Sequence, residues 1–126
     1  MKHARNPATV HEPVGRYVHT IEVSGADRML FVSGQVGMDR DGNVPDDPAA
    51  QFQIALRNVL LCVEVAGFEP SDIVKLVTYA VVDLDPAKRR EALDRALGEH
   101  VTTSTLIYVS RLAAPQYLVE IDAWVA

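Results

Sequence analysis

The N-terminal quarter of the chain alternates apolar and polar positions with the period of a β-strand. Residues 17–23 alternate in this way, and residues 30–33 form a second apolar run after the turn at residues 24–27. This pattern predicts a β-hairpin that begins near Gly15. Residues 1–14 show no periodicity, so we expect them to form an extended arm.

Two later segments have the apolar spacing of amphipathic helices. Each begins with an aspartate followed by proline, Asp47-Pro48 and Asp85-Pro86, which is typical of a capped first helical turn. Glycines at 67 and 98 are the predicted stops. The apolar stripes contain, in the first helix, Phe52, Leu56, Val59, Leu60 and Val63, and in the second, Ala92, Leu93, Ala96 and Leu97.

Three further strands complete the predicted order ββαβαββ. The segments are residues 73–82, a long β-branched run typical of a central strand, and residues 105–112 and 117–125. Both helices can lie on one side of a mixed β-sheet, which makes the fold class α+β, a two-layer sandwich in a single domain of residues 1–126. The other sheet face keeps apolar residues, Val18, Val32 or Phe31, and Val119 or Trp124, that water would not solvate well.

Composition excludes several classes of function. The 126 residues carry a formal net charge of −5 and no basic run longer than Lys88-Arg89-Arg90, which argues against a nucleic-acid partner. No apolar run approaches the length of a membrane span, and the first residues lack the apolar stretch of a signal peptide. The single cysteine, Cys62, has apolar neighbours and is interpreted as a small core residue, so we expect a cytoplasmic protein.

One apolar strand breaks at small residues. Residues 29–32 run directly into Ser33-Gly34-Gln35, and Gly37 follows. Glycine within a strand pattern usually marks a β-bulge or a bend, and this is the simpler interpretation. The alternative is that the backbone here closely approaches a ligand or a neighbouring subunit.

Six short motifs are spread over nearly the whole chain with almost no gaps. They are Gly15-Arg16-Tyr17, Val32-Ser33-Gly34-Gln35, Glu64 to Phe68, Asp72 to Lys75, Gly98-Glu99-His100 and Leu118 to Ala123. Together they resemble the RidA family, also called the YjgF type. The resemblance implies a chorismate-mutase-like or YjgF-like sandwich that forms homotrimers, with clefts for small-molecule ligands at the subunit boundaries. It also implies hydrolysis of reactive enamines and imines that pyridoxal-phosphate enzymes release, without a cofactor or metal of the protein's own.

The resemblance assigns roles to residues on several elements. Glu120, within Val119-Glu120-Ile121, matches the glutamate that positions water, and its alternative is a solvated strand carboxylate. Tyr17 matches a cleft tyrosine that in many members follows Gly-Pro, although Arg16 stands in place of the proline, and its alternative is an ordinary strand tyrosine. Ser33 and Gly34 would line the ligand site.

The arginine that grips the substrate carboxylate in the family is absent. With Gly98-Glu99-His100 as anchor, its position falls on Ser104, and a cysteine often found two positions later is Leu106. A serine hydroxyl makes one neutral hydrogen bond where a guanidinium makes two charged ones. We therefore expect 2-imino acids to be poor substrates.

A second cation could replace the missing one. Arg90 borders the apolar stripe of the second helix, and its long side chain could carry a guanidinium to the rim of the cleft. The alternative is an ion pair with Asp94 or Glu91, and Arg89 lies even nearer the centre of the stripe.

Three functions follow from these observations. The leading one is a trimeric hydrolytic deaminase with altered substrate preference. The second is a binding or sensor module without turnover. The third is an endoribonuclease, an activity described for some relatives, which the acidic charge balance makes the weakest.

Overall fold

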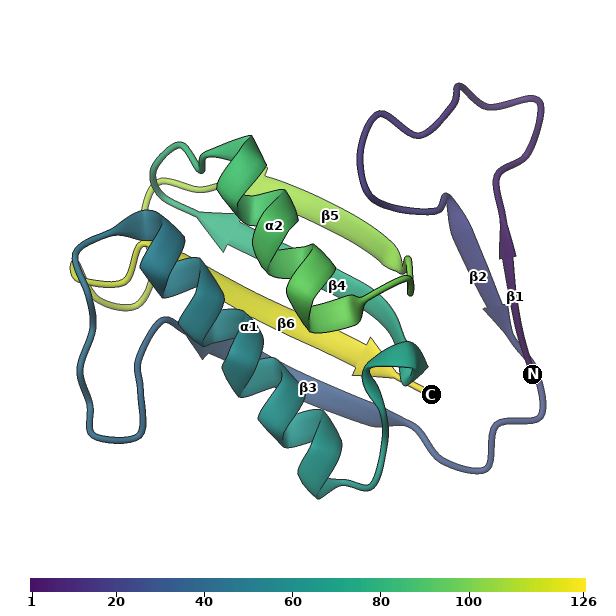
Figure 1. The fold of residues 1–126 in the computed structure, drawn as a ribbon, viewed down its shortest axis with the longest axis horizontal. Helices are drawn as coiled ribbons and strands as arrows, with labels where there is room; N and C mark the ends of the chain where they lie inside the picture. Colours follow the sequence, from purple (N-terminus) through teal and green to yellow (C-terminus); the bar gives the residue numbers. More distant parts are fainter.

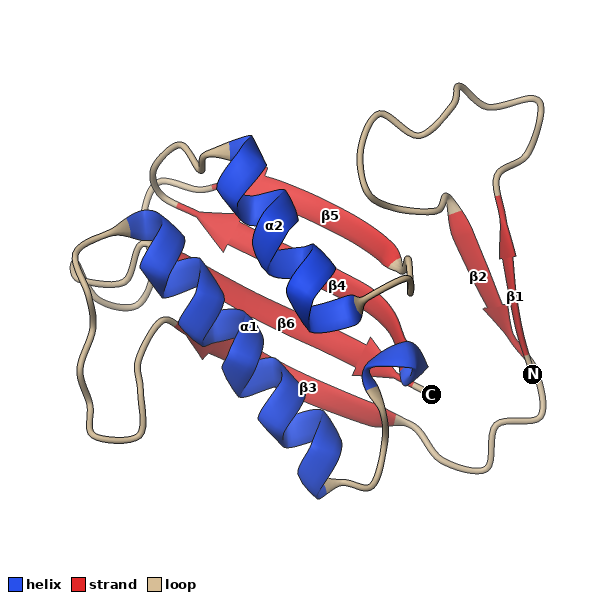
Figure 2. Ribbon diagram, in the orientation of Figure 1, coloured by secondary structure: helices blue, strands red, loops and turns tan.

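The computed structural model describes residues 1–126 as two helices packed on one face of a four-stranded mixed sheet (Figures 1 and 2). The sheet order is β3-β6-β4-β5, in which β4 and β5 are parallel and the other neighbours antiparallel. The bounds are β3 Leu30–Val36, α1 Pro48–Val65, β4 Ile73–Ala80, α2 Pro86–Leu97, β5 Thr103–Tyr108 and β6 Val119–Val125, with a short 3₁₀ helix, Pro70–Asp72, before β4. The predicted fold class is confirmed.

Both helices begin and end where their capping residues predict. The Asp47 carboxylate accepts a hydrogen bond from Ala50 N at 3.1 Å, and that of Asp85 accepts bonds from Ala87 N and Lys88 N at 2.9 and 3.2 Å. These bonds satisfy backbone donors that the first turn leaves without helical partners. Gly98 ends α2 with a φ of 58°, a left-handed conformation that suits glycine.

The core lies between the helices and the inward face of the sheet. Its largest fully buried apolar side chains are Leu56, Val59, Val63, Ile73, Val119, Ile121 and Val125. On the opposite face of the sheet, which we call the uncovered face, Phe31 and Trp124 are 63% and 52% exposed, with their rings edge to face at 5.7 Å. Of the alternatives left open from the sequence, Phe31 and Trp124 therefore face outward, and Val32 and Val119 belong to the core.

The predicted N-terminal hairpin is wrong in its pairing. The strand β2, Thr20–Val23, pairs with β1, Lys2–Arg5, whereas β3 pairs with β6. A strand therefore forms inside the segment expected to be an extended arm. The sequence Lys-His-Ala-Arg gave no signal because all four residues are exposed, so no apolar alternation marks the strand.

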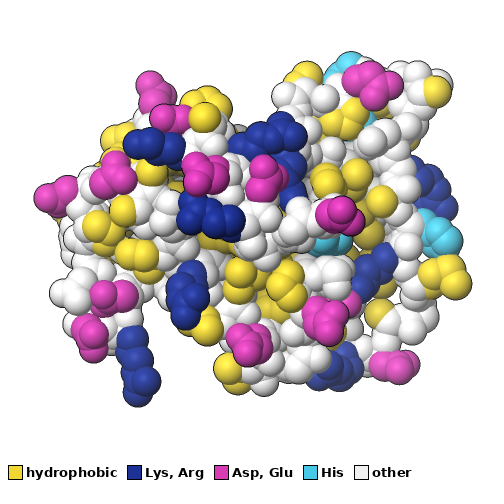
Figure 3. Space-filling model, in the orientation of Figure 1, with side chains coloured by type: hydrophobic (Ala, Val, Ile, Leu, Met, Phe, Trp, Pro, Cys, Tyr) yellow, Lys and Arg dark blue, Asp and Glu magenta, His cyan; other side chains and the backbone are white.

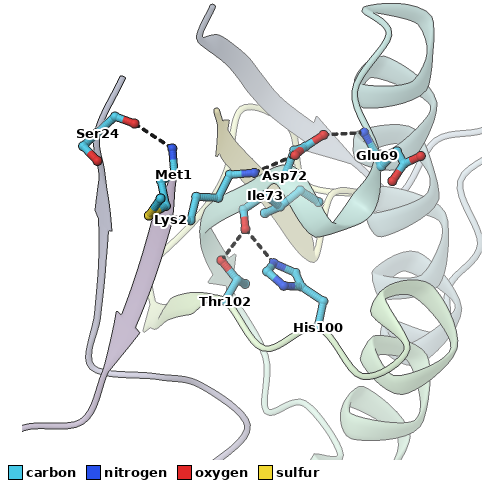
Figure 4. A network of polar contacts seen from close by, with 8 residues as sticks. All are labelled: Met1, Lys2, Ser24, Glu69, Asp72, Ile73, His100 and Thr102. Atoms are coloured by element: carbon cyan, nitrogen blue, oxygen red, sulfur yellow. Dashed lines mark hydrogen bonds and ion pairs between the residues drawn. The ribbon is translucent and has the colours of Figure 1, made fainter. Parts of the chain in front are cut away.

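The N-terminal hairpin is a separate two-stranded sheet beside the main one (Figure 1). Lys2 Nζ is 2.6 Å from Asp72 Oδ1 at the start of β4, and Val18 N donates to Thr102 O at 3.2 Å (Figure 4 shows the first contact). Burial would raise the pKa of Asp72, but the bonds from Lys2 and from Glu69 N outweigh it and lower this pKa. Charged and backbone bonds thus hold the hairpin against β4 and the loop before β5.

One smaller expectation needs revision. Cys62 is exposed on the outer side of α1, together with Leu61 and Val65, so it is not a core residue. The buried stripe of α1 passes through Val59 and Val63 and leaves position 62 exposed to solvent.

Neither α1 nor α2 combines the length and apolar character that crossing a membrane requires.

Candidate functional site

A β-bulge in β3 brings Gly34 against Glu120. Val32 lies opposite Ala123 and Gln35 opposite Ile121, so Ser33 and Gly34 together face only Asp122. A Cβ at Gly34 would lie 2.6 Å from Glu120 Cδ and would also overlap the carboxylate oxygen. The bulge predicted from the sequence is confirmed, and the group that the backbone approaches is the Glu120 side chain of the same chain.

Glu120 lies on the uncovered face beside a second carboxylate that the sequence analysis missed. Asp122, two residues later on β6, accepts a hydrogen bond from the Tyr79 hydroxyl at 3.1 Å, and its other oxygen is buried without a partner. Removal from water raises the pKa of the Tyr79 phenol, and the neighbouring carboxylates of Asp122 and Glu120 raise it further. The period of two along β4 and β6 was the signal that could have placed these three side chains on one face.

The uncovered face is also hollowed next to the N-terminal hairpin. This hollow of about 400 Å³ is lined by Ile21, Val74, Lys75, Val77, Thr103 and Trp124. Lys75 Nζ donates to Thr105 Oγ1 at 2.8 Å at its side. None of the residues predicted for the site lines this hollow.

Ser104 faces the opposite side of the sheet from Glu120. It pairs with Leu76, which points into the core, whereas Glu120 pairs with Tyr79 on the uncovered face. Leu106 and Tyr108 follow on the Ser104 side, and Tyr108 confirms that orientation because its hydroxyl accepts a bond from Leu84 N at 3.3 Å. One chain alone therefore does not bring Ser104 and Glu120 together.

The two arginines of α2 differ in their surroundings. Arg90 is exposed and makes neither of the ion pairs considered for it, because Asp94 pairs with Arg16 and Glu91 with Arg95. The Arg89 guanidinium lies 5.9 Å from the centre of the Phe52 ring, and its buried Nε has no hydrogen-bond partner. Burial lowers the pKa of this guanidinium.

Tyr17 lies in the segment before β2, not in a strand as predicted. Its hydroxyl accepts a hydrogen bond from Val14 N at 3.2 Å, and its ring packs edge to face on His19 at 5.5 Å. The next residue, Val18, is bonded to Thr102, two residues before Ser104. The structure therefore places Tyr17 near the start of β5, apart from Glu120 and Gly34.

Arg16 fixes this segment to the end of α2. Its guanidinium is 2.6 Å from Asp94 Oδ1 and donates to the carbonyls of Gly98 and His100 at 2.5 and 3.0 Å, and the side chain is only 9% exposed. A cation at the C-terminal end of a helix also interacts favourably with the negative end of the helix dipole. The residue that departs from the family motif thus holds Tyr17 against the loop that leads to Ser104.

Replacement of Arg16 by alanine is expected to release this segment. Three charge-assisted bonds would be lost, so the free energy of unfolding should fall by about 2 kcal/mol. Hydrogen exchange at the Val18 amide should become faster. Arg40→Ala, at an exposed loop residue without an ion pair, is the matched control and should change stability by less than about 0.5 kcal/mol. Unchanged protection of Val18 in Arg16→Ala would contradict this role.

Comparisons with known proteins identify the family of this chain. The model of the endoribonuclease L-PSP family matches residues 8–126. A RutC family protein of Pyrococcus horikoshii is 32% identical over 114 residues, which cover 89% of this chain and 87% of the relative. The chain belongs to the RidA/YjgF family. The resemblance seen in the six motifs is therefore confirmed.

Two further relatives show how far the likeness extends. The 2-iminobutanoate/2-iminopropanoate deaminase of Escherichia coli is 38% identical over 81 residues, 62% of this chain and 60% of that enzyme. A crystal structure of YyfB, a protein of unknown function of the conserved Rid family from Yersinia pestis, superposes with a TM-score of 0.86 at 30% identity. The superposition covers 99% of this chain and 98% of the YyfB chain. Relatives of this RidA-family chain thus include a named deaminase and a protein without an assigned function.

Proposed function

We propose that the protein is a homotrimeric RidA-type hydrolase whose ligand clefts form between subunits and act on small reactive enamines or imines. The observation that carries this proposal is the bulge at Ser33-Gly34, which sets backbone against the Glu120 carboxylate on an uncovered and partly apolar face. Ser104 lies on the other face of the same sheet. A cleft that contains both positions therefore needs two copies of the chain.

Glu120 is the residue proposed to activate water. A carboxylate beside an imine carbon can orient a water molecule and take its proton while the water oxygen bonds to that carbon. The C–N bond of the resulting carbinolamine then breaks, which releases ammonia and leaves a carbonyl product. A bulge leaves backbone groups outside the strand ladder, so the amides around Ser33 and Gly34 can hydrogen-bond a ligand. Tyr17 would complete the cleft from a neighbouring subunit, because in its own chain it lies apart from Glu120.

The substrate preference should differ from that of the named deaminase. Ser104 cannot bind a carboxylate through two charged hydrogen bonds as an arginine does. No cationic side chain is present on β5, whose sequence is Thr-Ser-Thr-Leu-Ile-Tyr. Arg90 is the proposed substitute because its guanidinium is exposed and unpaired, whereas that of Arg89 folds over Phe52. The absence of a cation on β5 also favours the second candidate, a small-molecule binding or sensor protein without turnover.

The test is hydrolysis of 2-imino acids produced in the assay by an amino-acid oxidase. Wild type should be slow, and Ser104→Arg should raise kcat/KM by about 10- to 100-fold, which corresponds to about 1.4–2.7 kcal/mol for a charged bidentate contact. Glu120→Gln, alone and combined with Ser104→Arg, should abolish turnover. Arg90→Ala should raise the KM of the wild-type reaction.

Control variants separate the two candidate functions. Ser104→Ala should leave the rate nearly unchanged, because a neutral hydroxyl contributes little to holding a carboxylate. A wild-type rate equal to that of arginine-bearing relatives would show that the carboxylate is held elsewhere. Binding of small carboxylates without turnover, both in wild type and in Ser104→Arg, would favour the binding module.

A further inference from the structure

A groove between α1 and α2 lies on the outer surface of the helix layer, away from the uncovered face. Its volume is about 300 Å³, at the lower end of the range of roughly 300–1,000 Å³ found for small-molecule sites. Leu56 and Leu60 from α1 and Ala92 and Ala96 from α2 form its apolar floor. The two alanines, one helical turn apart, leave the space that a larger side chain would fill.

Guanidinium groups stand on both walls of this groove. Arg57 lies on the α1 wall and Arg95 on the α2 wall. Arg57 makes no ion pair, and Arg95 pairs only with Glu91, at 2.8 Å, with both side chains about two-thirds exposed. An exposed pair of this kind contributes little to stability, so Arg95 can turn to another anion at small cost. Figure 3 shows this side of the molecule, where Lys and Arg side chains lie among hydrophobic ones over the helices.

We propose that this groove binds a small anionic amphiphile, an aliphatic monocarboxylate, with the carboxylate between Arg57 and Arg95 and the chain on the apolar floor. Arginine presents paired N–H donors that match the two oxygens of a carboxylate. Two arginines line this groove although the chain as a whole is acidic, with a net charge of −5. The four floor residues are apolar, and Gln53, the one uncharged polar side chain that lines the groove, is exposed, so the floor favours an aliphatic chain.

The site is independent of the deaminase proposal. No residue that lines the groove belongs to the proposed cleft. Glu120, Ser33 and Gly34 lie on the opposite face of the sheet, and neither Ser104 on β5 nor Arg90 on α2 lines the groove. A ligand bound here and a ligand bound in a cleft of the uncovered face would therefore perturb different residues. The two proposals can fail separately.

Octanoate, titrated into the ¹⁵N-labelled full chain, is the probe. Amide shifts should concentrate at residues 53–60 and 92–96, with a Kd of about 1 mM, as expected for a ligand of this size on a shallow site. Acetate, which lacks the chain, and octylamine, which reverses the charge, should bind at least tenfold more weakly. Shifts that concentrate instead on β5, β6 or the bulge would overturn the assignment.

Variants of exposed residues test each part of the groove. Arg57→Gln and Arg95→Gln should each weaken octanoate binding about fivefold, and Ala96→Leu, which fills the floor, at least as much. Glu91→Gln should strengthen binding two- to threefold, because it frees Arg95 and removes a repelling carboxylate. Arg111→Gln, in the exposed segment after β5, is the matched control and should have no effect. Equal affinities for Arg57→Gln and Arg111→Gln would rule the site out.

Discussion

Replacing Gly37 by alanine is expected to lower the free energy of unfolding by about 3 kcal/mol. A Cβ at Gly37 would lie 2.5 Å from Gln51 Cβ, 2.6 Å from Gln51 Cα and 2.7 Å from its carbonyl oxygen. These are atoms of the helix itself, so relief requires α1 to move away from β3.

Gln51 makes that movement costly. The side chain is fully buried and donates from Nε2 to Pro45 O and Gln116 O at 2.8 and 2.9 Å, while its Oε1 accepts from Leu118 N at 2.8 Å. A shift of the helix start would leave these buried groups unpaired, and each unpaired group costs about 1–3 kcal/mol. The methyl at position 37 therefore conflicts with a network that joins α1 to the turn before β6.

Thermal and urea unfolding at fixed protein concentration measure this effect. For a domain of this size, about 3 kcal/mol corresponds to a fall in Tm of roughly 10 °C. Gly15→Ala is the matched control, because the nearest atoms to its added Cβ are 3.8 Å away, and it should lower stability by less than about 1 kcal/mol. The same loss in both variants would show that contact with Gln51 does not determine the result.

The two glycines near the end of β3 illustrate how far the sequence leads. The run Ser33-Gly34-Gln35-Val36-Gly37 predicted a bulge, or alternatively a close approach to a ligand or a neighbouring subunit. The structure contains the bulge, and the groups that the two glycines approach belong to the same chain. Which group fills the space could not be read from the pattern, because Glu120 and Gln51 come from elements far away in the chain. A glycine marks where the backbone needs room and gives no information on the identity of its neighbour.

Elements whose signals are local were predicted well. The caps Asp47 and Asp85 and the stop Gly98 act within one helical turn, so the helix bounds followed from neighbouring residues. Strand pairing is a long-range property. β1 and β2 are largely exposed and short, so nothing in their own residues specified that they pair with each other instead of with β3.

The candidate site also combines features that short sequence motifs predict with features that depend on distant parts of the chain. The family motifs predicted Glu120, Gly34 and Ser33, and the structure brings these together. They did not predict that Asp122 and Tyr79 stand beside Glu120, or that Arg16 is nearly buried under the end of α2. The period of two places Asp122 on the same face as Glu120, but which residues of β4 and β5 lie beside them depends on the strand register, which only the folded sheet fixes.

Substitution of Trp124 by lysine is expected to dissociate the proposed homotrimer, with association weakened at least about 100-fold, or about 2.7 kcal/mol. Phe31 on the edge strand β3 and Trp124 near the end of β6 form an exposed aromatic pair on the uncovered face. If copies of the chain pack through this face, a lysine at 124 would be removed from water without a partner, which carries a large cost. Sedimentation equilibrium at micromolar concentration should give a trimer for wild type and a monomer for Trp124→Lys.

Val65→Lys is the matched control, since Val65 is 88% exposed on the outer side of α1 and should lie outside the interface. This variant should remain trimeric. A monomeric wild type would end the assembly proposal, and a trimeric Trp124→Lys would move the interface to another surface. Because Glu120 and Ser104 lie on opposite faces of one sheet, dissociation should also abolish whatever gain in turnover Ser104→Arg produces. Retained turnover by a monomeric Ser104→Arg, Trp124→Lys variant would instead place the reaction within a single chain.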